Sequence, residues 1–102
     1  MRRGELWLAE VGRKQRPVLL LTRTEVLDAR SLVTVAEITT SIRGLAAEVD
    51  FDHAKAGVRR ESVINCDGLH TVAQASMSGP IGRVDDDVMI KVCAALSYSL
   101  GC

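Results

Sequence analysis

The residues best suited to chemistry stand at the ends of two short apolar runs. Arg16 directly precedes Pro17 and the run at residues 18–21, and Thr39 closes a second run that begins at Leu32. Proline restricts the residue before it to extended backbone, so we expect a strand to begin at Pro17 and to hold the arginine rigidly. A planar, permanently charged guanidinium matches the geometry of a phosphate. The alternative is a structural salt bridge for Arg16 and an ordinary β-forming role for Thr39.

The two histidines are further candidates for proton transfer, because imidazole titrates near neutral pH. His53 follows Asp52 in a stretch that we expect to be a loop, and His70 lies in a later extended segment. Nothing in their spacing requires the two rings to meet. We therefore expect His53 to be an exposed loop residue.

The composition limits how this chain could hold a nucleic acid. Of its 102 residues, 47% are hydrophobic but only 3% are aromatic. This length predicts one domain, residues 1–102, with a single core of aliphatic side chains. So few rings cannot form the stacking platform that common single-strand-binding modules use. If RNA binds here, polar contacts must read it.

The charge is balanced overall but unevenly distributed. The chain has 13 basic and 13 acidic residues, which argues against a nucleic-acid partner. Residues 1–24, however, hold six basic and two acidic side chains, a net charge of +4, while acidic residues gather later, at residues 50–52 and 85–87. Such a basic segment is typical of a phosphate-binding surface and equally of a solvated sheet edge.

The cysteines indicate no metal or disulfide chemistry. Cys66, Cys93 and Cys102 have no CxxC spacing and no nearby histidine pair, so neither a metal site nor a disulfide framework is expected. The apolar run at residues 18–21 is too short for a secretory signal or a membrane span. We therefore expect a soluble cytoplasmic protein with reduced thiols and no cofactor.

Short extended segments dominate the chain. The continuous apolar run at residues 18–21 is typical of a strand buried on both faces. We expect a basic loop at residues 11–15, a turn or one helical turn at residues 23–31, and turns at residues 67–68 and 78–80. Strands are predicted by β-branched runs or by alternation at residues 5–10, 17–22, 32–39, 47–52, 62–65, 69–72 and 81–84.

A C-terminal helix is the clearest element. Asp85 is expected to cap it, Asp86 and Asp87 complement the positive end of its dipole, and Gly101 ends it. Many short strands and one terminal helix predict a mainly β fold, a small antiparallel barrel. The helix should face the core with an apolar stripe formed by Val88, Met89, Val92, Cys93, Leu96 and Leu100.

An ordered set of motifs covers nearly the whole chain. Arg-Gly-Glu-Leu-Trp stands at residues 3–7 and Arg-Pro-Val-Leu-Leu at residues 16–20, and further segments follow at residues 36–39, 62–64, 70–72 and 99–101. In this order they resemble the MazF/PemK family of toxin ribonucleases. The resemblance implies an SH3-like barrel with added helices that usually forms a homodimer. It also implies a MazE-like antitoxin whose C-terminal segment lies across an RNA groove.

The resemblance also implies a reaction and the residues that carry it. The family cuts single-stranded RNA without a metal, and its catalytic arginine and threonine correspond to Arg16 and Thr39. RNA can be cleaved by its own 2′-hydroxyl, so the enzyme needs only to position the backbone, stabilise phosphorane charge and help protons move. Arg16 would supply charge-assisted hydrogen bonds and Thr39 a further one. The expected products are a 2′,3′-cyclic phosphate and a 5′-hydroxyl.

Polar residues on or beside the loops that flank this pair are candidates for RNA contacts. Basic side chains would mostly bind phosphates, whereas Gln15 and Asn65 could read base edges. His70 stands where the family usually has arginine, which favours an RNA contact over a catalytic role. The expected RNA-binding residues are Arg13, Lys14, Gln15, Thr40, Ser41, Arg43, Asn65 and His70.

Two other functions are compatible with the sequence. CcdB toxins are similar in architecture and poison gyrase through the C-terminal end of the chain, which would assign residues 99–102 to an interaction tip. That group depends on a tryptophan near its terminus, whereas the single tryptophan here is Trp7. The other alternative is a catalytically inactive RNA-binding or dimerisation module. Neither alternative needs Arg16 and Thr39.

Overall fold

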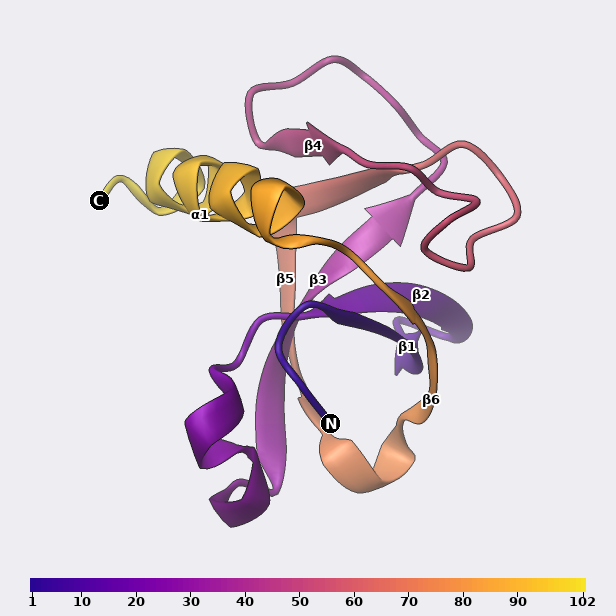
Figure 1. The fold of residues 1–102 in the computed structure, drawn as a ribbon, viewed down its shortest axis with the longest axis vertical. Helices are drawn as coiled ribbons and strands as arrows, with labels where there is room; N and C mark the ends of the chain where they lie inside the picture. The colour runs from indigo at the N-terminus through magenta and orange to yellow at the C-terminus, as the bar shows by residue number, and fades with distance from the viewer.

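Six strands form one antiparallel sheet in the computed structural model, which describes residues 1–102 (Figure 1). The strand order is β4-β5-β3-β2-β1-β6. The 3-10 helix η1 (Thr24–Ala29) connects β2 to β3, η2 (Gln74–Ser76) connects β5 to β6, and α1 (Asp86–Leu100) ends the fold. The mainly β class with a C-terminal helix is confirmed. The strands are β1 (Glu5–Val11), β2 (Lys14–Leu20), β3 (Leu32–Thr39), β4 (Glu48–Asp50), β5 (Val63–Ala73) and β6 (Ser78–Arg83).

The sheet is closed by a loop and not by a pair of strands. The two edge strands, β4 and β6, are not hydrogen-bonded to each other. Residues 51–62 leave β4 in a turn in which the Val58 N–H donates to the His53 carbonyl, and this loop packs on β6. A Cβ added to Gly82 would overlap the Ala56 carbonyl oxygen, which shows how closely the backbones approach. The predicted barrel is therefore a curved sheet whose two edge strands are bridged by this loop and are not hydrogen-bonded to each other.

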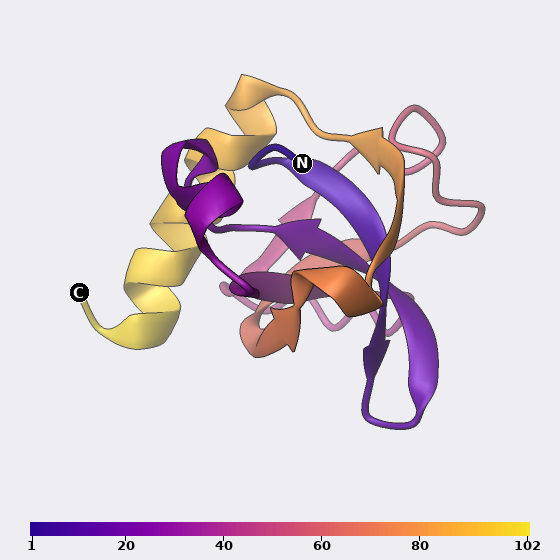
Figure 2. The same cartoon turned by 90° about the horizontal axis from the view of Figure 1, so that it is seen from below.

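The β1–β2 hairpin is longer than the sequence predicts. Val11 pairs with Lys14 across a two-residue turn, so residues 11–15 are not a loop. The turn is possible because Gly12 takes a positive φ of 67°, the backbone geometry that two-residue hairpins favour. As a result the hairpin projects from the rest of the molecule (Figure 2).

Pro17 lies inside β2 and not at its first residue. It is the fourth residue of the strand, opposite Leu8 of β1. The pairing between β2 and β3 begins only at Val18, one residue further on. The missing N–H of the proline therefore removes no bond from that ladder, which is how a strand accepts it.

One long strand replaces the two that were expected at residues 62–65 and 69–72. Asn65 pairs with Glu37 and Leu69 pairs with Ala36, so three residues of β5, Cys66–Gly68, have no pairing partner on β3. The Asp-Gly pair forms a bulge and not a turn, because hydrogen bonding to β3 resumes on its far side. The bulge lies next to the candidate site described below.

The two edge strands also differ from the sequence expectation. β4 is confined to Glu48–Asp50 and is shorter than the expected residues 47–52, because the chain turns away after Asp50. β6 begins at Ser78 and includes Pro80, where a turn was expected. Its pairing with β1 is irregular between Leu6 and Leu8, and proline is tolerated on such an edge strand.

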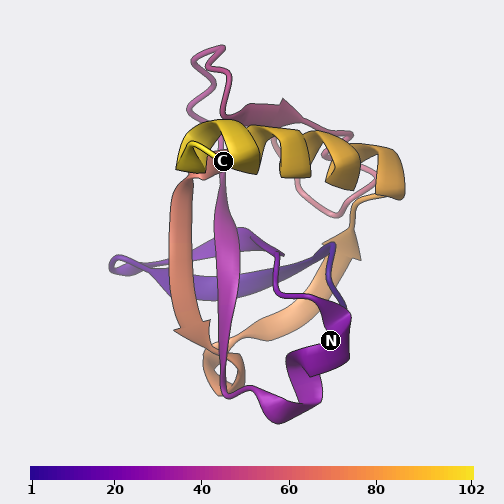
Figure 3. The ribbon, with the colours of Figure 1, turned by 90° about the vertical axis from the view of Figure 1, so that its left-hand side faces the viewer.

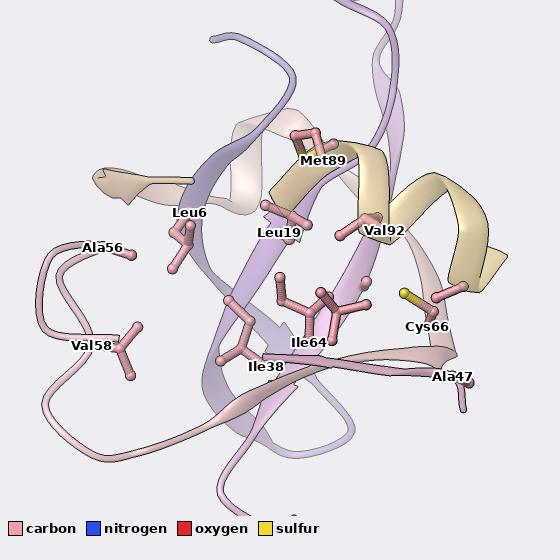
Figure 4. Close-up of a cluster of buried hydrophobic side chains, with 13 residues drawn as sticks. Leu6, Leu19, Ile38, Ala47, Ala56, Val58, Ile64, Cys66, Met89 and Val92 are labelled. Atoms are coloured by element: carbon pink, nitrogen blue, oxygen red, sulfur yellow. The ribbon is translucent and has the colours of Figure 1, made fainter. Parts of the chain in front are cut away.

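Both faces of β2 are buried, as its continuous apolar run predicts. Val18, Leu19 and Leu20 are each 0% exposed. Leu19 faces a first core cluster under α1, where Figure 4 shows Val92 of the helix beside Leu19 and Ile64. The other face belongs to a second cluster, composed of Ala9, Val11, Val18, Leu20, Leu27, Val33, Val35 and Met77.

The ends of α1 agree with the sequence, whereas its buried face is narrower. The Asp85 side chain accepts a hydrogen bond of 3.0 Å from the Val88 N–H, and Gly101 ends the helix with a φ of 76°. The helix lies across β5 and beside β4 (Figure 3). Neither this helix nor any other in the protein is long and apolar enough to span a membrane.

Two members of the expected stripe are exposed. Cys93 and Leu100 face solvent, whereas Ala95 is buried with Met89 and Val92. The buried face of the helix is therefore rotated slightly from the predicted stripe, and Cys93 lies at the edge of the buried face. There the Arg3 guanidinium donates to the Cys93 sulfur at 3.3 Å, so this arginine is engaged with the helix.

Replacing Gly82 by alanine should weaken the closure of the sheet. The added methyl group would overlap the Ala56 carbonyl oxygen, and a backbone atom cannot rotate away, so we expect a loss of about 3 kcal/mol in the free energy of unfolding. Gly12→Ala is the control: it has a positive φ but open space around it, and should cost about 1 kcal/mol. Urea unfolding followed by circular dichroism measures both. Equal midpoints for the two variants would contradict close packing of the loop on β6.

Candidate active site

Side-chain alternation places Arg16, Glu37 and Thr39 on one face of the sheet. Arg16 is two residues from Val18, and Glu37 and Thr39 are two and four residues from Val35. Val18 and Val35 both belong to the second core cluster. Successive side chains of a strand point to opposite faces, so all three polar residues continue the face of that cluster. On this face of the sheet, the apolar second core cluster is therefore followed by a polar edge that contains Arg16, Glu37 and Thr39.

Arg16 and Thr39 occupy facing positions where β2 and β3 separate. The last pair of the β2–β3 ladder is Val18 opposite Glu37. Two more residues of the same register would bring Arg16 opposite Thr39, but the strands are no longer paired there. The two side chains predicted to form the catalytic pair therefore border the opening between the strands.

The guanidinium of Arg16 has no partner within the protein. The residue is half-buried, yet its side chain makes neither a hydrogen bond nor an ion pair with any other residue. This result excludes the structural salt bridge that was the alternative for Arg16. A cation on a buried strand without an internal counter-charge is available to bind an anion.

The hydroxyl of Thr39 is held in place by the backbone that follows it. Its Oγ1 accepts a hydrogen bond of 3.1 Å from the Ser41 N–H. A hydroxyl group can accept and donate at the same time, so its own proton stays available. Thr39 can therefore donate to an oxygen that lies near Arg16.

Two further predicted residues lie on this face, and the sequence analysis missed a third. Asn65 pairs with Glu37, and His70 pairs with Val35, so both continue the polar edge onto β5. The missed residue is Glu37, whose Oε1 lies 3.3 Å from the His70 Nε2. Its position two residues before Thr39 in a predicted strand was the signal that could have found it.

The residues of the hairpin are exposed but point in different directions. Arg13 is in the turn, and Lys14 shares the face of Arg16 by alternation. Gln15 lies on the opposite face of β2. The structure therefore brings Lys14 near the candidate site, whereas Gln15 stays a prediction without geometric support.

The loop after β3 contains three exposed predicted residues, Thr40, Ser41 and Arg43. Arg43 already has a partner, because its Nε lies 3.8 Å from the Glu48 Oε2 and its backbone N–H donates to the Glu48 Oε1. Burial raises the pKa of Glu48, but the N–H groups of this loop and the Arg43 charge lower it by more, and the net shift is downward. Glu48 therefore anchors the loop that begins at Thr39.

The remaining titratable candidates take no part in this site. His53 Nδ1 lies 2.8 Å from the Val58 carbonyl oxygen, and the ring is half-buried in the loop, not exposed as expected. Nothing connects it to His70. Burial, together with the nearby Asp67 and Cys93, raises the pKa of Cys66 to about 11, so this thiol is uncharged at neutral pH.

A groove of about 520 Å³ lies on the other side of the same strands. Pro17 and Ile38, the neighbours of Arg16 and Thr39, form part of its wall, and Arg59 and Arg60 of the loop after β4 form another. Two other hollows, of about 370 and 440 Å³, border α1 and contain none of the predicted site residues. The 520 Å³ groove is therefore the one that adjoins the candidate site.

Comparison of the sequence with models of known protein families shows which family the chain belongs to. Residues 2–100 match the family described as PemK-like, MazF-like toxin of type II toxin-antitoxin system. The chain belongs to this family. The resemblance drawn from its motifs is thereby confirmed.

Individual members of the MazF-like family support the assignment. The chain is 36% identical over 102 residues to the probable endoribonuclease MazF2 of Mycobacterium tuberculosis, and the match covers all of both chains. Its fold is similar to the structure of the Mycobacterium tuberculosis toxin MazF-mt6, with a TM-score of 0.89, 34% identity and coverage of 95% and 96% of the two chains. A mycobacterial endoribonuclease in complex with its cognate antitoxin shares the fold, with a TM-score of 0.89, 21% identity and coverage of 99% and 95%.

Proposed function

We propose that this MazF-like toxin is an endoribonuclease that cleaves single-stranded RNA without a metal ion. The observation that carries the proposal is the half-buried, unpartnered Arg16 at the position facing Thr39. The relatives named as endoribonucleases support the same activity. The whole chain, residues 1–102, is taken as one toxin domain that acts in the cytoplasm.

The chemistry follows from what the two side chains can donate. The RNA 2′-hydroxyl attacks the adjacent phosphorus, the bond from phosphorus to the 5′ oxygen breaks, and that oxygen takes up a proton. Arg16 stabilises the negative charge that develops on the phosphorane, and Thr39 donates to a non-bridging oxygen. Arginine cannot serve as a base because it stays protonated. The products are a 2′,3′-cyclic phosphate and a 5′-hydroxyl.

The partners proposed for this chain are a second copy and an antitoxin. A small domain with an open sheet gains stability from a partner surface, which supports the homodimer. The groove walled by Arg59, Arg60 and apolar side chains suits an acidic, apolar segment that folds on binding, as a MazE-like antitoxin would supply. Solved complexes of MazF with MazE from Deinococcus radiodurans share the fold.

Incubation of a mixed single-stranded RNA pool with the purified protein in excess EDTA tests this function. We expect cutting at recurrent short sequences, with 5′-hydroxyl ends that accept phosphate from polynucleotide kinase without prior phosphatase treatment. A protein that cuts only when Mg²⁺ is added, or that leaves 5′-phosphate ends, would contradict the proposed reaction. Absence of cutting by folded protein would favour a binding role.

A further inference from the structure

We propose that Glu37, Asn65, Gly68 and His70 form a base-reading subsite that discriminates against uracil at one position near the cut. The proposal rests on the ribonuclease function and adds a specificity determinant to it. Four observations support it: the position of the cluster on the sheet, the closeness of Glu37 to His70, the packing of Glu37 and Asn65 against Gly68, and the balance of hydrogen-bond acceptors and donors.

His70 lies too far from the catalytic pair to share its phosphate. His70 pairs with Val35, four residues from Thr39 along β3. At about 3.3 Å per residue, this separation is about 13 Å along the strand. A general base works within about 3 Å of the proton that it takes, so His70 does not serve the phosphate between Arg16 and Thr39. His70 is instead placed to contact a nucleotide further along the same face.

Glu37 lies beside the buried nitrogen of the His70 ring. The His70 Nε2 makes no hydrogen bond and lies 3.3 Å from the Glu37 Oε1. The other ring nitrogen, Nδ1, has no partner and is not among the buried atoms, so it reaches solvent. A carboxylate beside Nε2 favours the proton on that nitrogen. In the neutral ring Nδ1 is then a hydrogen-bond acceptor that faces the RNA.

Gly68 lets the Glu37 carboxylate and the Asn65 amide pack closely against β5. A Cβ at this position would lie against the Glu37 Oε2 and 3.0 Å from the Asn65 Nδ2. The Asn65 Oδ1 already accepts a hydrogen bond of 3.0 Å from the Asp67 N–H, so its Nδ2 remains as a donor. The bulge of β5 thus brings Glu37, Asn65 and Gly68 together in one polar cluster.

The cluster presents more hydrogen-bond acceptors than donors. His70 Nδ1 and the Glu37 carboxylate accept, whereas Asn65 Nδ2 donates. Adenine, cytosine and guanine carry an exocyclic amino group that can donate here. Uracil presents one N–H between two carbonyl oxygens, and one of these oxygens would face the carboxylate. A good set of base contacts discriminates by 1–3 kcal/mol, so we expect uracil to be disfavoured about tenfold.

The test is sequencing of the products from a randomised single-stranded RNA pool at pH 8.5. For the wild type we expect uracil to be depleted about tenfold at one fixed offset from the cut. Glu37→Gln replaces an acceptor oxygen with a donor N–H₂, and should abolish this depletion at that offset alone. Glu25→Gln, an exposed carboxylate in η1, is the matched control and should leave the profile unchanged.

Each contrary result points to a different failure. An unchanged profile for folded Glu37→Gln would overturn the subsite, and so would a uniform loss of cutting at every sequence in His70→Ala. If Glu37→Gln does not fold, His70→Ala makes the same test, because it removes the acceptor from a partly exposed position. No cutting by the wild type would count against the ribonuclease function itself.

Discussion

Arg16→Ala is expected to lower the rate of RNA cleavage by about 10²–10³-fold, because removing one preorganised donor to a developing anion typically costs this much. The fold should survive, since the guanidinium makes no hydrogen bond or ion pair within the protein that the change would break. Single-turnover cleavage of one labelled RNA at saturating protein measures the effect on the chemical step.

Two variants make this expectation specific to the guanidinium. Arg16→Lys keeps the charge but loses the planar fork, and should recover only part of the rate. Arg30→Ala removes the same charge from an exposed position after η1 and should cleave at nearly the wild-type rate. Full activity of folded Arg16→Ala would leave the reaction without its main source of charge stabilisation. The binding-module or gyrase-directed interpretations would then be favoured.

Leu19→Ala is expected to cost 2–5 kcal/mol of the free energy of unfolding, which is the usual range for deleting a buried leucine side chain (~3 kcal/mol at the centre). Leu19 is 0% exposed and lies between the sheet and α1, where the neighbouring side chains cannot easily fill the space (Figure 4). Urea unfolding followed by far-ultraviolet circular dichroism measures the loss.

The chain offers a matched control in β3. Leu32 is 55% exposed, so Leu32→Ala should change the stability by less than about 0.5 kcal/mol. If both variants unfold at the same urea concentration, Leu19 is not part of the core that the structure describes. Because a domain of this size is only marginally stable, the Leu19 variant is also expected to be degraded quickly in cells.

The sequence predicts elements that depend on local chemistry. The Asp85 cap, the Gly101 stop and the two buried faces of β2 could all be foreseen, because each follows from neighbouring residue types. Cys93 could not be placed, since small shifts in the rotation of a helix on its sheet decide whether a residue on the flank of an apolar stripe is covered. The length of the β1–β2 hairpin was missed because Gly12 permits a tighter turn than the basic residues suggest.

The candidate site was foreseen through motifs and completed by register. Arg16 and Thr39 are recognisable from their positions beside apolar runs, but their opposition depends on how β2 and β3 align. Glu37 escaped notice because its neighbour His70 lies 33 residues away in the sequence and meets it only through the bulge in β5. Pairings of this kind are set by strand register, which no local pattern contains.

The loop that closes the sheet has two roles: one part packs against the sheet, and another part lines the groove. The side chains of Ala56–Gly57 must stay small because this part presses on the backbone of β6. Arg59 and Arg60 line the groove, and their size is not restricted in this way. Over evolutionary time the first part should resist change and the second should vary with the ligand. Within a few residues, one loop can therefore diversify what the toxin binds while its anchor preserves the scaffold.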